Sequence, residues 1–493
     1  MSGRSAVTVA VMLATTMVSL DTTIANVALP HMQGGVSATQ DQIAWVLTSY
    51  LVATAVMTPL SGWLAGRFGR RRLLLSSIAG FTAVSILCGV AQSLFQLVAF
   101  RTAQGLFGAS LIPLSQAVLL DAYPQNQHPR AMAIWAAGAM VAPIFGPVIG
   151  GWLTDRYSWH WIFFINLPIG LAAFLGVSLF AAADRPDKSR LFDFFGFSTF
   201  SLGIAAFQLL LDRGQFKDWF ASGEIRIEAM VSAFFLFLFV LHTLTADRSF
   251  FNRALLADRN FIMASITAAV VGGLFNASLA LLPSMMQTLL GYPAVTTGIA
   301  MAPRGLGSLA GFFLISRMIR CFGPRSVLAA GLCLMCLTQW QMSQFALSMD
   351  MAPVIRSSFL QGLGIGFSFI PSSTIAFSML APALRTEGAA IFNLIRTLGG
   401  SVGISLTQTH LVRNTQAFHS LLAEHVRLDN PLAHPPFLLP PFDLSTTTGV
   451  ARIDAEVTRQ ASMLAYVADF RTLMLAALAS LALLMLMRSP RPK

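Results

Sequence analysis

The stretch LDTTIANVALP, residues 20–30, ends an apolar run that begins near Ala6. The run is about as long as the ~20 residues that an α-helix needs to cross a bilayer, so we expect it to remain as a first span rather than to be removed as a signal peptide. It contains a carboxylate, Asp21, that would lie inside the membrane. An unpaired charge near the bilayer centre costs roughly 2.5–3.5 kcal/mol or more. Because of this cost, we predict that Asp21 has a partner or a function.

The composition predicts an all-α integral membrane protein. Of its 493 residues, 55% are hydrophobic and only 11% are charged, whereas soluble domains carry about 25% charged residues. Fourteen apolar segments are long enough to be transmembrane helices: 6–29, 44–66, 73–92, 97–120, 131–153, 161–182, 194–211, 228–246, 261–284, 296–316, 325–345, 354–378, 389–411 and 470–487. An even number of spans places both termini on the same side of the membrane.

The basic residues of the loops predict which side that is. With both termini in the cytoplasm, the inner segments hold nineteen Lys and Arg residues and the outer segments hold nine. Loops that face the cytoplasm carry the excess of positive charge, so this orientation is favoured. Topology thus explains the net charge of +11, since no stripe of basic and aromatic residues predicts a nucleic-acid groove.

The two ends of the chain repeat each other at an offset of 254–258 residues. The matching positions are Gln104-Gly105 with Gln361-Gly362, Ile112-Pro113 with Ile370-Pro371, Pro124 with Pro382, Ala131 with Ala389, and Gly69 with Gly323. The repeat predicts a six-helix bundle at 1–190, two inserted helices at 191–258 and a second six-helix bundle at 259–493. Such repeated halves are typical of secondary transporters, whose binding site lies near the bilayer midplane.

A long outer loop is predicted at 412–469, between the last two spans. It contains a proline-rich stretch at 434–443, where regular structure is disfavoured, and a polar stretch at 450–468 that could form a helix. Long loops in compact proteins are usually functional or disordered. Contact with a partner protein and a disordered spacer therefore remain as alternatives.

Asp21 has one natural partner, Arg101 in the fourth span. The two residues lie about five residues apart in depth, or ~7 Å along the membrane normal, which an arginine side chain can reach. A carboxylate's pKa rises when the group is desolvated and falls beside a cation. Asp21 could therefore take up a proton on one side of the membrane and release it on the other. The alternatives are a purely structural buried pair for Asp21 and a snorkelling side chain for Arg101.

Other polar residues inside spans are candidates for a substrate cavity. Arg304 and Arg396 in the second half each lie beside glycines, and could neutralise an anionic substrate or form structural pairs. The remaining candidates are uncharged: Tyr50, Gln104, Gln208, Asn276 and Gln361. Many phenylalanines and methionines would give such a cavity a greasy, adaptable lining.

Two stretches are candidates for gating and close helix packing. The fifth span carries Gly138, Pro143, Gly146, Pro147, Gly150 and Gly151. Small residues allow helices to approach closely and proline bends them, so this span could simply pack tightly or could also seal the outer end. The loop after Gly62 carries Gly69, Arg70 and Arg71, and is either a topology anchor or a gate contact.

Several function classes are excluded or disfavoured. None of the three lysines follows a glycine, so the chain has no phosphate-binding loop of the GK[ST] type. The four cysteines and the histidines of the outer loop lack metal-ligand spacing, so we expect no metal site, no organic cofactor and no enzyme activity. A dedicated exporter or passive carrier of one endogenous metabolite remains the alternative to a coupled exporter. Asp21 discriminates between coupled and passive transport, since it should be required for uphill export and dispensable for downhill flow.

With these motifs in place, the chain resembles the fourteen-helix drug:proton antiporter branch of the major facilitator superfamily. The stretches that carry the resemblance are LDTTIANVALP, GWLAGRFGRRR (62–72), RTAQGLFGASLIPLSQ (101–116), GAMVAPIFGPVIGGW (138–152) and WIFFINLPIG (161–170). More narrowly, LIPLSQ, APIFGP and LLLDRGQFKDWF (209–220) resemble EmrB-type exporters. One departure is Gly66, which stands where the family's loop motif has an acid.

The resemblance implies a function and partners. It implies a multidrug exporter of the bacterial inner membrane that expels lipophilic drugs or weak acids and is powered by the proton gradient, with a functional arginine at the position of Arg101. It also implies a periplasmic adaptor protein and an outer-membrane channel as partners in a tripartite pump. We expect the 412–469 loop or the two inserted helices to contact the adaptor.

Overall fold

The computed structural model describes residues 3–124, 127–182, 192–246, 249–378, 380, 384–426 and 446–487. Every regular element within these ranges is a helix. The first half contains α1 (Gly3–Gly35), α2 (Gln40–Ile43), α3 (Trp45–Met57), α4 (Leu60–Phe68), α5 (Arg70–Gly89), α6 (Leu94–Gly108), α7 (Leu111–Ala122), α8 (His128–Arg156), α9 (Trp161–Phe164) and α10 (Asn166–Phe180). The rest contains α11 (Phe194–Arg213), α12 (Gly223–Thr245), α13 (Arg253–Ala257), α14 (Arg259–Thr288), α15 (Ala294–Met342), α16 (Ala352–Ser378), α17 (Arg385–Ala423) and α18 (Thr447–Leu486).

The helices agree with the predicted membrane spans. In the described ranges, eleven helices are long and apolar enough to cross a bilayer, or twelve if α3 and α4, which bend by 55° at their junction, form one span. All fourteen predicted segments fall on helices, and α15 covers two of them, which are joined at a kink where Gly323 has a non-helical backbone conformation. The all-helical membrane fold is therefore confirmed, and the arrangement is compatible with fourteen spans.

The sequence repeat is visible in the backbone. Gly69, between α4 and α5, has a φ of 90°, and its repeat mate Gly323 inside α15 has a φ of 77°. Residues with a side chain rarely adopt such positive φ values, whereas glycine does so at little cost. Both halves therefore make the same tight turn with the same residue type.

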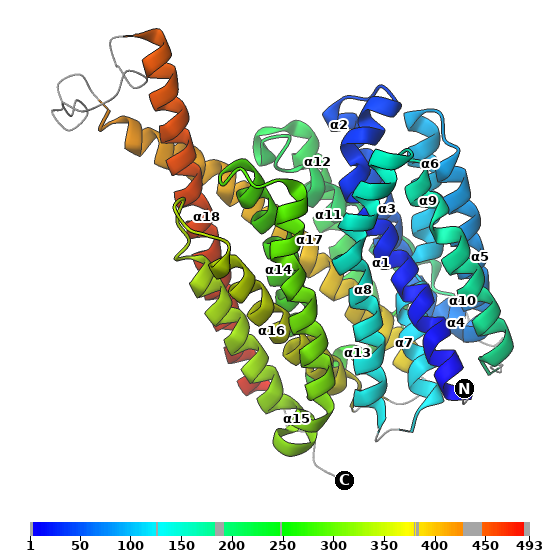
Figure 1. Ribbon diagram of the computed structural model, residues 1–493. Coiled ribbons are helices and arrows are strands. Elements are labelled where there is room, and N and C mark those ends of the chain that lie inside the picture. Colours follow the sequence, from blue (N-terminus) through cyan, green and yellow to red (C-terminus); the bar gives the residue numbers. More distant parts are fainter. Residues whose placement is uncertain are drawn as a thin grey trace.

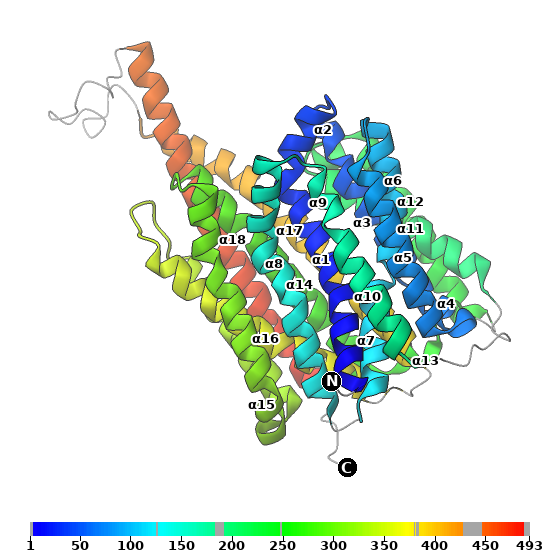
Figure 2. The same cartoon turned by 45° about the vertical axis from the view of Figure 1, so that its right-hand side comes forward.

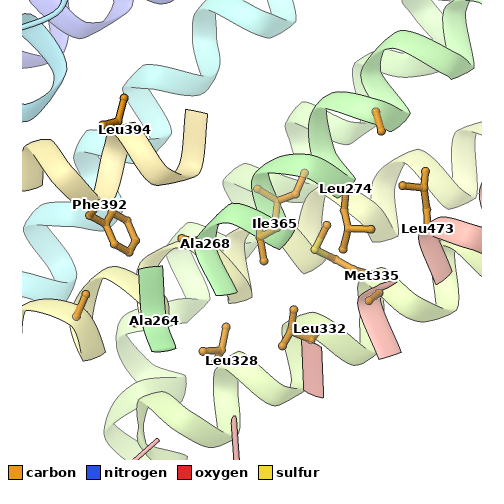
Figure 3. Close-up of a cluster of buried hydrophobic side chains, with 14 of the residues drawn as sticks. Ala264, Ala268, Leu274, Leu328, Leu332, Met335, Ile365, Phe392, Leu394 and Leu473 are labelled. Carbon is orange, nitrogen blue, oxygen red and sulfur yellow. The ribbon is translucent and has the colours of Figure 1, made fainter. Parts of the chain in front are cut away.

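The halves lie side by side, with the two inserted helices beside them (Figures 1 and 2). The start of α1 and the end of α18 lie at the same end of the bundle, as an even number of spans requires. The second half has its own apolar core, in which Leu274 of α14, Met335 of α15 and Ile365 of α16 lie close together (Figure 3). The inserted α11 is tied to this half, since Ser405 Oγ donates to the Leu211 carbonyl at 2.8 Å.

Direct contacts between the halves occur near the end that holds both termini. Asn393 Nδ2 of α17 donates to Gln116 Oε1 of α7 at 2.7 Å, and both side chains are buried. Trp135 of α8 stacks on Phe369 of α16 with 6.4 Å between ring centroids. These contacts join the first half to the second through α7 and α8, so the two halves are closed against each other at this end.

The helices extend further into the predicted outer loop than the apolar runs suggested. α17 continues to Ala423 and α18 begins at Thr447, so most of the described residues of 412–469 are helical. The helix expected at 450–468 is confirmed as part of α18, and Thr446 caps it by accepting a hydrogen bond from the Gly449 N–H at 3.0 Å. The two extensions project from the bundle (Figure 1). The proline-rich stretch lies outside the described residues.

Candidate functional site

Asp21 and Arg101 form a buried ion pair in the first half. Arg101 Nη1 of α6 lies 2.6 Å from Asp21 Oδ2 of α1, and each side chain is only 1% exposed. The predicted difference in depth therefore allows a direct contact. Charge-assisted hydrogen bonds of this length are the strong ones in proteins, and the pair offsets part of the desolvation cost of both groups.

Two amides complete the coordination of the carboxylate. Gln104 Nε2 of α6 and Asn166 Nδ2 of α10 each donate to Asp21 Oδ1 at 2.9 Å. Arg101 Nη1 also donates to Gln104 Oε1 at 2.7 Å, which orients that amide. Helices α1, α6 and α10 thus meet at Asp21. Gln104, which we predicted to be a cavity residue, lies in this cluster, and its role in a substrate cavity stays a prediction.

A second layer of contacts holds the cluster in place. Ser85 Oγ of α5 accepts a hydrogen bond from Asn166 Nδ2 at 2.9 Å and donates to the Phe163 carbonyl at 2.9 Å. The guanidinium carbon of Arg101 lies 4.3 Å from the ring centroid of Tyr50, a cation–π contact. Sequence reasoning missed Asn166 and Ser85, although Asn166 is conspicuous as a polar residue within the apolar stretch WIFFINLPIG.

Glycines of α8 allow that helix to pack closely against α1 and so position Asp21. A Cβ atom on Gly150 would lie 2.9 Å from a methyl group of Ile24, and one on Gly146 would lie 3.0 Å from Thr23. Thr16 Oγ1 also donates to the Gly138 carbonyl at 3.1 Å. The described atoms leave open space at Gly151, so close packing does not explain that glycine.

The prolines of the same stretch, Pro143 and Pro147, lie within α8. Their side chains fall outside the described part of the chain.

The predicted gate residues lie at the closed end. Arg70 forms an ion pair with Asp121 at the end of α7, and Arg71 donates to the Ser178 carbonyl of α10. The loop thus contacts neighbouring helices of its own half. Gly62 of α4 faces the other half, since a Cβ atom there would lie 3.0 Å from the Cα of Glu387. A gating role for these residues stays a prediction.

The cavity candidates of the second half do not join the Asp21 cluster. Arg304 and Gln361 are buried, and Arg396 of α17 is half-buried. The carbon of the Arg396 guanidinium lies 5.4 Å from the ring centroid of Phe369. Asn276 Nδ2 donates to the Gly272 carbonyl within its own helix at 2.9 Å, so its amide is already engaged.

Gln208 lies apart from both groups, on the inserted α11. Its Nε2 donates to Asp212 Oδ1 and to Ser401 Oγ of α17, both at 3.0 Å. Asp212 is therefore part of the helix packing, although the apolar runs placed it outside the spans. The same holds for Asp469 of α18, which is fully buried with its Oδ1 2.5 Å from His410 Nδ1.

Charge holds the first-half cluster together. Arg101 balances the Asp21 carboxylate, and two amides donate to its Oδ1. Loss of either charge would remove the ion pair that joins α1 to α6, so the packing of these helices depends on both residues.

Comparison with known proteins identifies the family. The model of the Major Facilitator Superfamily matches residues 11–404. The chain is 37% identical to the multidrug export protein EmrB of Haemophilus influenzae, covering 92% of this chain and 89% of that protein. It is also 37% identical to the fatty acid resistance protein FarB of Neisseria gonorrhoeae, covering 85% of this chain and 83% of that protein.

Solved structures agree on the fold. The human organic anion transporter MFSD10 superposes with a TM-score of 0.60 at 13% identity, over 96% of this chain and 99% of that one. A bacterial homologue of the lysosomal transporter Spinster, in an inward-facing state, superposes with a TM-score of 0.58 at 17% identity, over 99% of both chains. Family model, relatives and fold agree: the chain is a multi-pass membrane protein that belongs to the major facilitator superfamily, among relatives that are multidrug exporters.

Proposed function

We infer that this protein is a proton-coupled antiporter that exports lipophilic drugs or weak acids across the bacterial inner membrane. The observation that carries the proposal is the buried pair of Asp21 and Arg101, with Gln104 and Asn166 bound to the same carboxylate. Buried ionisable residues inside membrane helices are expensive and usually mark ion or substrate pathways. The names of the relatives, multidrug export and fatty acid resistance, support the substrate class.

Alternating access would link this pair to transport. With the end that holds the termini closed, a proton from the outer side would neutralise Asp21 and release Arg101. Helices α1, α6 and α10 would then shift, and the contact between Asn393 and Gln116 would open. Release of the proton inside would restore the ion pair and reset the carrier.

The proton gradient supplies enough free energy for useful export. One charge entering down a 100 mV potential supplies ~2.3 kcal/mol. Because ~1.4 kcal/mol corresponds to a tenfold ratio, one proton per cycle supports about a fortyfold gradient of a neutral substrate.

Inverted membrane vesicles test the proposal. Vesicles that contain the protein should accumulate a lipophilic dye when the interior is made acidic, and should lose it when a protonophore collapses the gradient. Vesicles without the protein serve as the control. Dye uptake that is the same with and without the gradient would contradict proton coupling and favour a passive carrier.

We also infer that the termini are cytoplasmic and that the projecting ends of α17 and α18 contact a periplasmic adaptor protein, which in turn contacts an outer-membrane channel. The resemblance to EmrB-type exporters and the projection of these helices from the bundle support this proposal (Figure 2). Replacing residues 416–454, which include the projecting ends of α17 and α18, with a glycine–serine linker is expected to abolish co-purification of the adaptor. Unchanged co-purification would remove this segment as the contact.

A further inference from the structure

The second half contains a buried arginine that has no hydrogen-bond partner among the described residues. The Arg304 side chain on α15 is 5% exposed, and its Nε, Nη1 and Nη2 atoms are all buried without a hydrogen-bond partner among the described residues. The guanidinium carbon lies 5.9 Å from the ring centroid of Phe275. One aromatic ring compensates only a small part of the cost of burying a cation. The part of the chain that the structure describes therefore offers this arginine no ion pair.

Further unpartnered polar groups lie on the helix that packs against Arg304. Helix α16 contacts the backbone of α15 at this residue, since a Cβ atom on Gly362 would lie 1.9 Å from the Arg304 carbonyl oxygen. Gln361 precedes Gly362, and Ser358 lies one turn before it; both side chains are fully buried. Among the described residues, neither amide atom of Gln361 has a hydrogen-bond partner, and nor does Ser358 Oγ. Where α15 meets α16, an amide and a hydroxyl thus join the guanidinium as buried groups whose hydrogen-bonding capacity is unused.

The first half shows what this region lacks. Gln361 repeats Gln104 at an offset of 257 residues, and at the same offset Ser358 repeats Arg101. In the first half, Gln104 and Arg101 bind the carboxylate that α1 supplies. The counterpart of α1 is α14, which contains no aspartate or glutamate between Arg259 and Thr288. The second half thus keeps the glutamine and gains a cation from α15, but α14 supplies no carboxylate.

Two other charged residues of the second half, Asp469 and Arg396, do not supply the missing carboxylate. Asp469, a buried acid in the described part of this half, is already paired with His410. Arg396, which packs on α14 through its backbone at Gly272, adds a second positive charge. Arg304 lies ten residues after the start of α15, which is ~15 Å into the membrane, near the middle of a ~30 Å hydrocarbon core. This is the depth at which transporters of this architecture bind their substrates.

We propose that Arg304, Gln361 and Ser358 form a binding site for the carboxylate of an exported amphipathic acid. The inference rests on the proposed export function. The ligand's carboxylate would take the place that Asp21 occupies in the first half, and Phe275 would contact its apolar portion. Because the polar atoms are enclosed in the present state, the ligand enters when the helices around α14 separate during the transport cycle.

Binding measurements on the full-length protein in detergent test this site. The probes are 4-phenylbutyrate, its uncharged methyl ester and sodium chloride. We expect wild type to bind 4-phenylbutyrate about tenfold or more tightly than the ester, since the charged hydrogen bonds are lost with the ester. Arg304→Gln should remove this preference while leaving ester binding unchanged. Arg356→Gln is the matched control, because Arg356 lies on α16 with an exposed side chain, and it should behave as wild type.

Three other outcomes would overturn the proposal. Equal affinity of wild type for the acid and the ester would show that the region does not recognise a carboxylate. Binding of chloride that depends on Arg304, without preference for the acid, would assign the site to an inorganic anion. Loss of ester binding together with acid binding in Arg304→Gln would indicate a structural role.

Two further measurements distinguish a failure of this inference from a failure of the proposed export function or a loss of folding stability. Proton-driven uptake of a cationic dye by wild type is measured first, since its absence would contradict the proposed function rather than the anion site. Arg304→Met should raise the melting temperature of the ligand-free protein, because it removes an unpaired buried charge. A lower melting temperature would mean that the arginine stabilises the fold and would contradict the proposal.

Discussion

Asp21→Asn is expected to abolish uphill export while preserving downhill flux. Asparagine has nearly the same shape as aspartate but cannot exchange a proton, so the carrier could still alternate without coupling. In vesicles with an imposed gradient, accumulation of a neutral dye should fall from about fortyfold to no more than equal concentrations on the two sides. Following dye uptake with and without the gradient measures both properties in one preparation.

The matched control is Asp350→Asn, which removes an exposed acid outside the predicted spans. It should accumulate dye as wild type does. If Asp21→Asn also accumulates dye as wild type does, Asp21 is a structural residue and another group couples transport to the gradient. Asp469 and Asp212 would then be examined first, because both are acids buried or half-buried between helices.

Removal of Arg101 should have the largest effect on stability. Arg101→Met leaves the Asp21 carboxylate buried with two amide donors but no cation, and breaking a buried pair in this way costs about 3–5 kcal/mol. The double variant Asp21→Asn/Arg101→Met carries no unpaired charge and should recover much of that loss. Melting temperatures in detergent at neutral pH, with Arg356→Met as an exposed control, measure the effect.

The relative stability of Arg101→Met and of the double variant shows how Arg101 stabilises the protein. A double variant that is no more stable than Arg101→Met would show that Arg101 stabilises the fold through its contacts with Val46 and Tyr50 rather than by balancing Asp21. A double variant close to wild type would show that the ion pair has little net effect on stability and is retained for its function.

Composition and the lengths of the apolar runs were sufficient to predict an all-helical membrane fold. Helices that cross a bilayer must be long and apolar, so every predicted span falls on a helix. The same criterion misplaced the ends of α17 and α18, since these helices continue as polar helices beyond the apolar runs, where hydropathy no longer marks them. For that reason Asp469 was predicted to lie in a loop, although it is buried within α18.

The site was only partly predictable. The pairing of Asp21 with Arg101 was predicted from the similar depths of the two residues in their spans, although a snorkelling Arg101 remained an alternative. Gln104 lies three residues after Arg101 and therefore on the same face of α6, so its place in the cluster was within reach of sequence reasoning. Asn166 was not, because its contact with Asp21 depends on which helices are neighbours.

In the second half, too, the sequence identified the polar residues but not which helices are neighbours. Arg304 and Gln361 were recognised as unusual polar residues, but the sequence did not show that their helices meet at this point or that both side chains lack hydrogen-bond partners among the described residues. That conclusion requires the packing of α16 on α15 at Gly362. The repeat then becomes informative, since it allows the two halves to be compared residue by residue.

The most direct test of the central claim, that Asp21 carries the coupled proton, is proton release on substrate binding. Purified protein in weakly buffered detergent solution would be mixed with an uncharged lipophilic substrate while a pH-sensitive dye reports free protons. We predict that wild type releases protons with a stoichiometry that depends on pH and that Asp21→Asn, which still binds the substrate, releases none. Equal release by wild type and Asp21→Asn would contradict the account and place the exchanged proton on a different residue.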